Sequence, residues 1–172
     1  MFRKRPIPAN NRENAQNPQT SAYVAALQML SRRELSEKQV RERLTRGGYE
    51  LPEVAEALER LKAERAVDDE RVAHAIARSQ TSIRRRGPLR VKREIEQAGI
   101  RGETARAAVE ATFDELSAAE LLVSVLDRKL KGRSTVADER QFRRLYRYLV
   151  TQGFESGQVL KALRARGYSA EE

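Results

Sequence analysis

The chain of 172 residues has no cysteine and no tryptophan, and only one histidine. The lack of cysteine excludes disulfides and thiolate metal sites, and it is compatible with a reducing compartment. No apolar run approaches the about 18 residues that a membrane-spanning helix needs. The start of the chain also lacks the apolar core of a secretory signal peptide. We therefore expect a cytoplasmic protein with no membrane partner.

Aromatic residues make up only 5% of the chain, and glycine and proline are few. The abundant Ala, Leu, Arg and Glu favour helix over sheet. No glycine-rich phosphate loop, Ser/His/Asp arrangement or paired-carboxylate site can be assembled. His74 is the only histidine and lies in an Ala-rich stretch without cysteine, and the acidic run at 68–70 is typical of a helix start. We expect no enzymatic activity, no metal and no cofactor.

One pattern occurs three times along the chain: an apolar helix end, a glycine, and a bulky apolar residue. The copies are Val40–Tyr49, Val91–Ile100 and Leu145–Phe154, with glycines at Gly48, Gly99 and Gly153. A period near fifty residues is typical of a small helical unit used repeatedly. The sequence predicts an all-α protein of three tandem three-helix repeats, or helix-turn-helix-like trios, forming an elongated curved arc.

The expected boundaries follow from this pattern. A disordered basic and polar tail at residues 1–20 precedes repeats at 21–67, 68–117 and 118–172. Ser36 and Gln39 predict a capping box at a helix start. Gly48 is expected to take a positive φ at a helix end, so that Tyr49 folds back onto the helix.

The net charge of +9 is unevenly distributed. Residues 23–70 carry nine bases and eleven acids, residues 71–117 ten bases and six acids, and residues 118–172 eleven bases and seven acids. A basic second and third repeat beside a mildly acidic first repeat suggests an extended polyanionic partner, and a second contact of different character.

Four segments follow one another along the chain: Leu30–Ser36 leading into Val40–Tyr49, the Asp-Asp-x-Arg segment Val67–Ala73, Arg84–Gly87 followed by Val91–Ile100, and Gln152–Phe154 leading to Leu163. In this order they resemble the RecX family of bacterial RecA regulators. The likeness spans roughly residues 23–168. It is carried by the Asp-Asp-x-Arg segment together with the three repeats rather than by any single motif.

The resemblance implies a non-enzymatic regulator, expected to be a monomer. Its implied partners are the RecA protein and the RecA filament on single-stranded DNA. It would inhibit filament extension, ATP hydrolysis, strand exchange and co-protease activity, and so act as a negative modulator of recombination and the SOS response. Weak direct contact with DNA is compatible with the same resemblance.

The first candidate binding region is a basic run that contains no acidic residue. It comprises Arg78, Arg84, Arg85, Arg86, Arg90, Lys92 and Arg93. Seven bases exceed what solubility needs, although charge runs often form only a solvated surface. The three arginines before Gly87-Pro88 are expected to meet phosphates or acidic side chains at a helix start.

The second candidate region lies in the third repeat. It comprises Arg128, Lys129, Lys131, Arg133, Arg140, Arg143, Arg144 and Arg147. The last four are three or four residues apart and share a helix face. Tyr146 and Tyr148 could stack on bases, but at helical spacing such residues more often belong to the core or its rim.

Two other functions remain open from the sequence. A direct DNA- or RNA-binding helical-repeat protein would show the same basic surface, with binding that weakens steeply with salt and needs no protein partner. A structural adaptor whose trios bind a partner's helix is a third interpretation.

Overall fold

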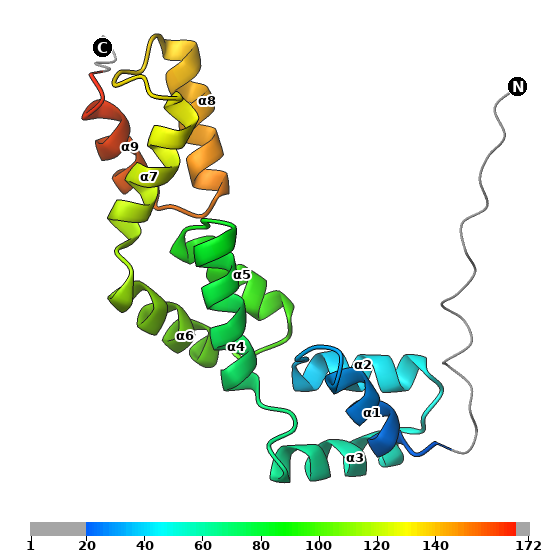
Figure 1. Ribbon diagram of the computed structural model, residues 1–172. Helices are drawn as coiled ribbons and strands as arrows, with labels where there is room; N and C mark the ends of the chain where they lie inside the picture. The colour runs from blue at the N-terminus through cyan, green and yellow to red at the C-terminus, as the bar shows by residue number, and fades with distance from the viewer. Residues whose placement is uncertain (1–19, 168–172) are drawn as a thin grey trace, which may run out of the picture. The chain divides into compact units, whose positions relative to one another are not determined.

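The computed structural model describes residues 20–167, so the tail predicted for residues 1–20 lies outside the described residues except for Thr20. Within this range every regular element is a helix (Figure 1), which confirms the all-α prediction. The elements are α1 (Ala22–Leu30), α2 (Glu37–Arg46), α3 (Leu51–Ala63), α4 (Asp69–Arg78), the π-helical turn η1 (Ser79–Ile83), α5 (Pro88–Gln97), α6 (Gly102–Glu115), α7 (Ala118–Leu130), α8 (Glu139–Thr151) and α9 (Ser156–Arg164).

The chain divides between Asp68 and Asp69 into two compact units. Unit 1 contains α1, α2 and α3, which enclose one core that includes Leu44, Leu58 and Leu61. The predicted capping box begins α2: the Ser36 hydroxyl accepts from the Gln39 amide, and the Gln39 side chain accepts from the Ser36 amide. Two amides that α2 could not pair internally are thus satisfied.

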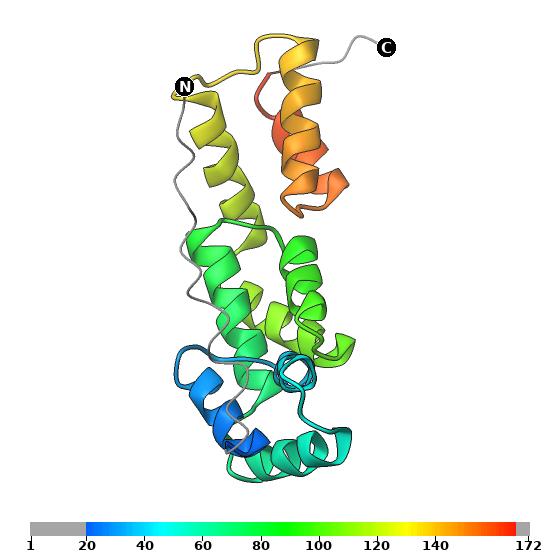
Figure 2. The ribbon, with the colours of Figure 1, turned by 90° about the vertical axis from the view of Figure 1, so that its right-hand side faces the viewer.

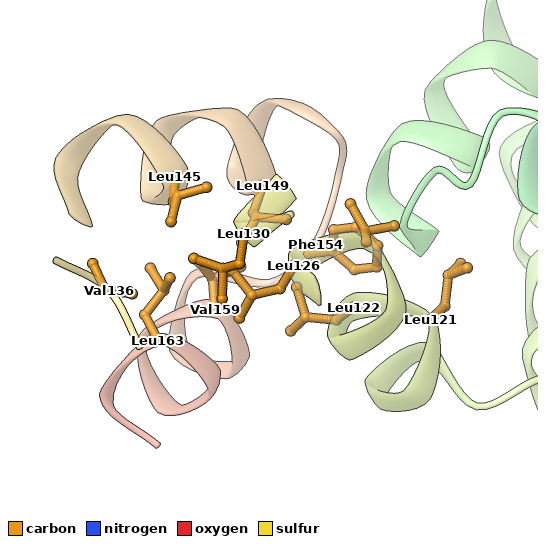
Figure 3. Packing of buried hydrophobic residues seen from close by; sticks show 11 residues of the cluster. Leu121, Leu122, Leu126, Leu130, Val136, Leu145, Leu149, Phe154, Val159 and Leu163 are labelled. Carbon is orange, nitrogen blue, oxygen red and sulfur yellow. The ribbon is translucent and has the colours of Figure 1, made fainter. Parts of the chain in front are cut away.

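Unit 2 contains α4 to α9 and has two cores. Helices α4, α5 and α6 bury Val91, Ile95 and their neighbours. Helices α7, α8 and α9 enclose a larger leucine-rich core around Phe154, as Figure 3 shows. Phe113 on α6 packs against both cores and so links them.

The repeated glycine turn has one conformation in all three copies, the positive φ that the sequence predicts for Gly48. Gly48, Gly99 and Gly153 have φ of +88°, +86° and +94°, a region that L-residues with a Cβ rarely adopt. The apolar residue after each glycine packs against the core of its own three-helix group. Ile100 and Phe154 are buried at 4% and 0% exposure. The sequence pattern therefore marks three helix ends that share one geometry.

Helix α5 begins where α8 ends, as Figures 1 and 2 show from two sides. The Gly87 amide donates to the Gln152 carbonyl at 2.9 Å, and the Leu89 amide donates to the Gly153 carbonyl at 3.1 Å. Helix starts leave amides unpaired and helix ends leave carbonyls unpaired, so each end satisfies the other. The positive end of the α5 dipole also faces the negative end of the α8 dipole.

This contact needs glycine on both sides. A Cβ on Gly153 would overlap the backbone nitrogen and Cβ of Arg90, and a Cβ on Gly87 would lie 2.5 Å from the Gly153 oxygen. The two backbones approach as closely as they do because neither glycine has a side chain. We call this contact the α5–α8 junction.

Replacing Gly153 by Ala should lower the free energy of unfolding of unit 2 by roughly 2–5 kcal/mol, because a left-handed alanine is strained and its methyl group overlaps Arg90. Gly132→Ala is the matched control. Gly132 has φ +83°, but a methyl group placed there would meet nothing within 4 Å, so only the conformational cost of about 1–2 kcal/mol applies. Equal losses in chemical denaturation would contradict the role given to the junction.

In unit 1, Tyr23, Arg60 and Glu64 form a small surface network between α1 and the end of α3. The Tyr23 hydroxyl donates to Glu64 at 2.6 Å, and Arg60 Nε donates to the same carboxylate at 3.0 Å. The Arg60 guanidinium lies 3.8 Å from the centroid of the Tyr23 ring. The pKa of Glu64 is lowered by the hydrogen bond from Tyr23 and then by that from Arg60.

A lowered folded-state pKa makes the Glu64 contribution to stability dependent on pH. The contribution is present above the unfolded pKa of about 4.3 and is lost as pH falls through the lower folded value. The difference in melting temperature between the native chain and Glu64→Gln should therefore be largest near neutral pH and should narrow below about pH 4. Glu56→Gln, an exposed change on the same helix, is the control variant. A difference for Glu64→Gln that stays constant with pH would contradict this explanation.

Candidate partner-binding surface

All fifteen basic residues singled out in the sequence lie in unit 2. The first group, which we call the loop cluster, surrounds η1 and the start of α5; it comprises Arg78, Arg84, Arg85, Arg86, Arg90, Lys92 and Arg93. The second, the α7–α8 cluster, lies on α7, α8 and the segment between them; it comprises Arg128, Lys129, Lys131, Arg133, Arg140, Arg143, Arg144 and Arg147.

The π-turn η1 positions the loop cluster. At its end the Arg86 amide donates to the Gln80 carbonyl at 3.0 Å, and the Arg85 amide donates to the Thr81 carbonyl at 3.1 Å. Arg85 has φ +52° in this ending, where glycine is the usual residue. The three consecutive arginines therefore lie at a tight backbone turn rather than along one regular helix face.

Two of the three arginines at 84–86 bind to other side chains of this protein. Arg86 pairs with Glu94 at 2.5 Å, with only 15% and 26% of the two side chains exposed. Arg85 Nη1 donates to the Ser124 hydroxyl on α7 at 3.1 Å. The basic run contains no acid of its own, but the fold supplies Glu94 from the next turn of α5. Arg84 is exposed, and its side chain has no polar partner in the described part of the chain.

Arg90 is the second arginine held by Glu94. Its Nε lies 3.4 Å from the carboxylate, and its Nη1 donates to the Thr151 carbonyl at the end of α8, at 3.2 Å. Arg90 thus reinforces the α5–α8 junction with a side chain. The more exposed Lys92 pairs with Glu96 at 3.7 Å. In the loop cluster, the side chains of Arg78, Arg84 and Arg93 are exposed without a polar partner among residues 20–167.

The α7–α8 cluster is exposed throughout. Arg143 pairs with Glu139 one turn earlier, and Arg147 Nε donates to the Arg143 carbonyl at 3.4 Å. Five members have side chains with no polar partner within the described residues: Arg128, Lys131, Arg133, Arg140 and Arg144. These cations are free to meet an external anion.

The spacing on α8 arranges its arginines as predicted. Arg140 and Arg144 lie one turn apart on the solvent side, while Leu145 and Leu149 are buried in the core. Tyr148, one turn beyond Arg144, is partly buried against that core. The Lys129 ammonium lies 4.2 Å from the centroid of its ring. Tyr148 is therefore a rim residue with a cation already on its ring, in the place where a stacked base would lie.

Sequence reasoning missed one basic group in unit 1. Arg43, near the end of α2, is half-buried, and its guanidinium pKa is lowered first by burial and then by Arg33 and Arg46. The spacing of Arg43 and Arg46 is a signal in the sequence, but the net negative charge of residues 23–70 does not predict a basic site there. Within residues 20–167 no group of three His, Cys, Asp or Glu residues could hold a metal ion, and no helix there is long and apolar enough to cross a membrane.

Two family models match the chain. The model described as "RecX, first three-helix domain" matches residues 22–61, within unit 1, and the "RecX, second three-helix domain" model matches residues 68–109. The crystal structure of RecX from Lactobacillus salivarius superposes with a TM-score of 0.72 at 24% identity, over 83% of this chain and 92% of that chain. The fold is thus that of a helical-repeat protein built from RecX-type three-helix domains.

Similar curated proteins specify the family. "Regulatory protein RecX" of Syntrophotalea carbinolica is 36% identical over 81% of this chain and 92% of its own length. The protein of that name in Acidithiobacillus ferrooxidans is 33% identical, over 85% and 93%. The chain spans about half of the Geobacillus thermodenitrificans relative, at 54% of its length. The chain belongs to the RecX family of regulatory proteins.

The Arg86–Glu94 ion pair should contribute more to stability than the Lys92–Glu96 ion pair on α5. Glu94→Gln leaves a largely buried guanidinium without its counter-charge and should cost roughly 1–3 kcal/mol. Glu96→Gln removes only the more exposed partner of Lys92 and should cost less than about 1 kcal/mol. Urea denaturation of both variants measures the difference, and equal small losses would show that Arg86 needs no internal partner.

Proposed function

We propose that this protein binds RecA and the RecA filament on single-stranded DNA and acts as a negative modulator. The inferred consequences are inhibition of filament extension, ATP hydrolysis, strand exchange and co-protease activity. The family relationship supports the regulatory role. The observation that carries the proposal is the set of exposed cations of unit 2 without partners in the described part of the chain, held on a scaffold of packed helices.

The mechanism we infer is occupancy of the filament groove. The free cations of the loop cluster and of the α7–α8 cluster would pair with acidic side chains of RecA or with nearby phosphates. The α5–α8 junction would hold the two clusters at a fixed separation, because backbone hydrogen bonds tie the start of α5 to the end of α8. A bound unit 2 would then block or bridge RecA protomers and disfavour extension.

The second candidate is direct binding to nucleic acid without RecA. The Arg140–Arg144 line and the Lys129 ammonium on Tyr148 favour phosphate contact over base stacking. Such binding would fall steeply with salt and would need no protein partner.

The test is ATP hydrolysis by RecA on single-stranded DNA, with this protein titrated in at near-physiological salt. Inhibition well below one copy per RecA, with weak binding to the same DNA alone, is the expected result. No effect on hydrolysis, together with tight salt-sensitive DNA binding, would overturn the proposal and support the second candidate.

A charge-matched pair of variants locates the surface. The double change Arg140→Ala with Arg144→Ala should raise the concentration for half-inhibition by about tenfold or more, because two free cations are lost. The control is Arg101→Ala with Arg106→Ala at α6, which removes the same charge from exposed positions outside both clusters. An equal effect of the two double variants would attribute inhibition to net charge and would remove the α7–α8 cluster from the proposed surface.

A further inference from the structure

The segment from Ser79 to Arg85 departs from regular structure in three ways. It contains the π-turn η1, a form that often occurs at functional sites. The side-chain oxygens Oε1 of Gln80 and Oγ1 of Thr81 are buried without a hydrogen-bond partner in the described part of the chain. The backbone of Arg85 has φ +52°, in the left-handed region that favours glycine. Each feature opposes stability, and such departures are expected where a segment serves a function.

The π-turn also changes which side chain faces solvent. Ala73, Ala77 and Thr81, each four residues apart, are buried at 0%, 0% and 1% exposure. A turn closed by i→i+5 bonds takes in one more residue than an α-turn, which displaces the following residues around the axis. Ile83, at the end of η1, is 78% exposed, the highest value among the exposed large hydrophobic residues of the described chain.

The surroundings of Ile83 are cationic. Arg84 follows it directly, and Arg78 precedes it by five residues, the spacing of the i→i+5 hydrogen bonds of a π-turn. Both arginines are exposed, and their side chains lack a polar partner among residues 20–167. We call Ile83 with Arg78 and Arg84 the Ile83 tip. An isolated exposed isoleucine is ordinary, but one presented by an irregular, energetically unfavourable turn between two free arginines is not.

We propose that the Ile83 tip is a protein-binding anchor, in which Ile83 enters an apolar pocket on the partner and Arg78 and Arg84 pair with carboxylates at its rim. A branched aliphatic side chain has no π-face to stack on a base, whereas apolar anchors in desolvated pockets dominate protein interfaces. The partner is the RecA protein, not its DNA, and in this the inference rests on the proposed function. The α7–α8 cluster then supplies the broader electrostatic contact.

The test compares Ile83→Ser with Leu51→Ser in the full-length chain. Leu51 is a matched control, because it is 68% exposed and lies in unit 1. Ile83→Ser should raise the concentration for half-inhibition of RecA ATP hydrolysis by about tenfold or more. Its melting temperature and its affinity for single-stranded DNA alone should equal those of the native chain, since little apolar area is buried at Ile83. Leu51→Ser should inhibit normally.

Salt separates the two parts of the tip. The defect of Ile83→Ser should persist when salt is raised, whereas that of Arg84→Ala should shrink as charges are screened. Native-like inhibition by Ile83→Ser would overturn the anchor while leaving the proposed function intact. A loss of DNA affinity or a lower melting temperature in Ile83→Ser would overturn it as well, by assigning Ile83 to DNA contact or to packing. If the native chain itself fails to alter hydrolysis, the proposed function and the anchor both fail.

Discussion

Unit 2 depends on one backbone contact, in which the unpaired amides at the start of α5 meet the unpaired carbonyls at the end of α8. The bonds from Gly87 and Leu89 join segments more than sixty residues apart in the chain. Each helix end would otherwise need water or a capping side chain. Glycine at 87 and 153 permits the approach, and Arg90 spans it from the side. These backbone hydrogen bonds therefore tie the two three-helix groups of unit 2 together where α5 begins and α8 ends.

The junction and the helices that it joins form a frame on which the basic residues divide into two roles. Arg86 and Arg90 share Glu94 and belong to the junction, and Arg85 reaches Ser124 on α7. The remaining arginines of the loop cluster and most of the α7–α8 cluster project from that frame into solvent. A run of like charges in the sequence therefore contains both structural cations and cations available to a partner. Cations held on packed helices lose less entropy on binding than cations on a flexible tail.

The sequence predicted those features that depend on local spacing. Three glycine turns, the Ser36 capping box and the arginine line of α8 all follow from residues within a few positions of one another. The π-turn was missed, because Ser79–Ile83 has no composition that separates it from an ordinary helix end. The bonds from Arg85 to Ser124 and from Arg90 to Thr151 were missed because both acceptors lie on distant helices. Long-range contacts of this kind depend on how the trios pack, which a single sequence does not state.

Hydrogen–deuterium exchange of this chain, with and without the RecA filament on single-stranded DNA, tests most directly whether unit 2 carries the binding surface. Backbone amides are reported segment by segment, so the unit that meets the partner is visible without mutation. We expect added protection at residues 79–86 and in the first turns of α8, with little change in α6. Added protection confined to residues 20–68, or none in unit 2, would contradict the assignment of the binding surface to unit 2.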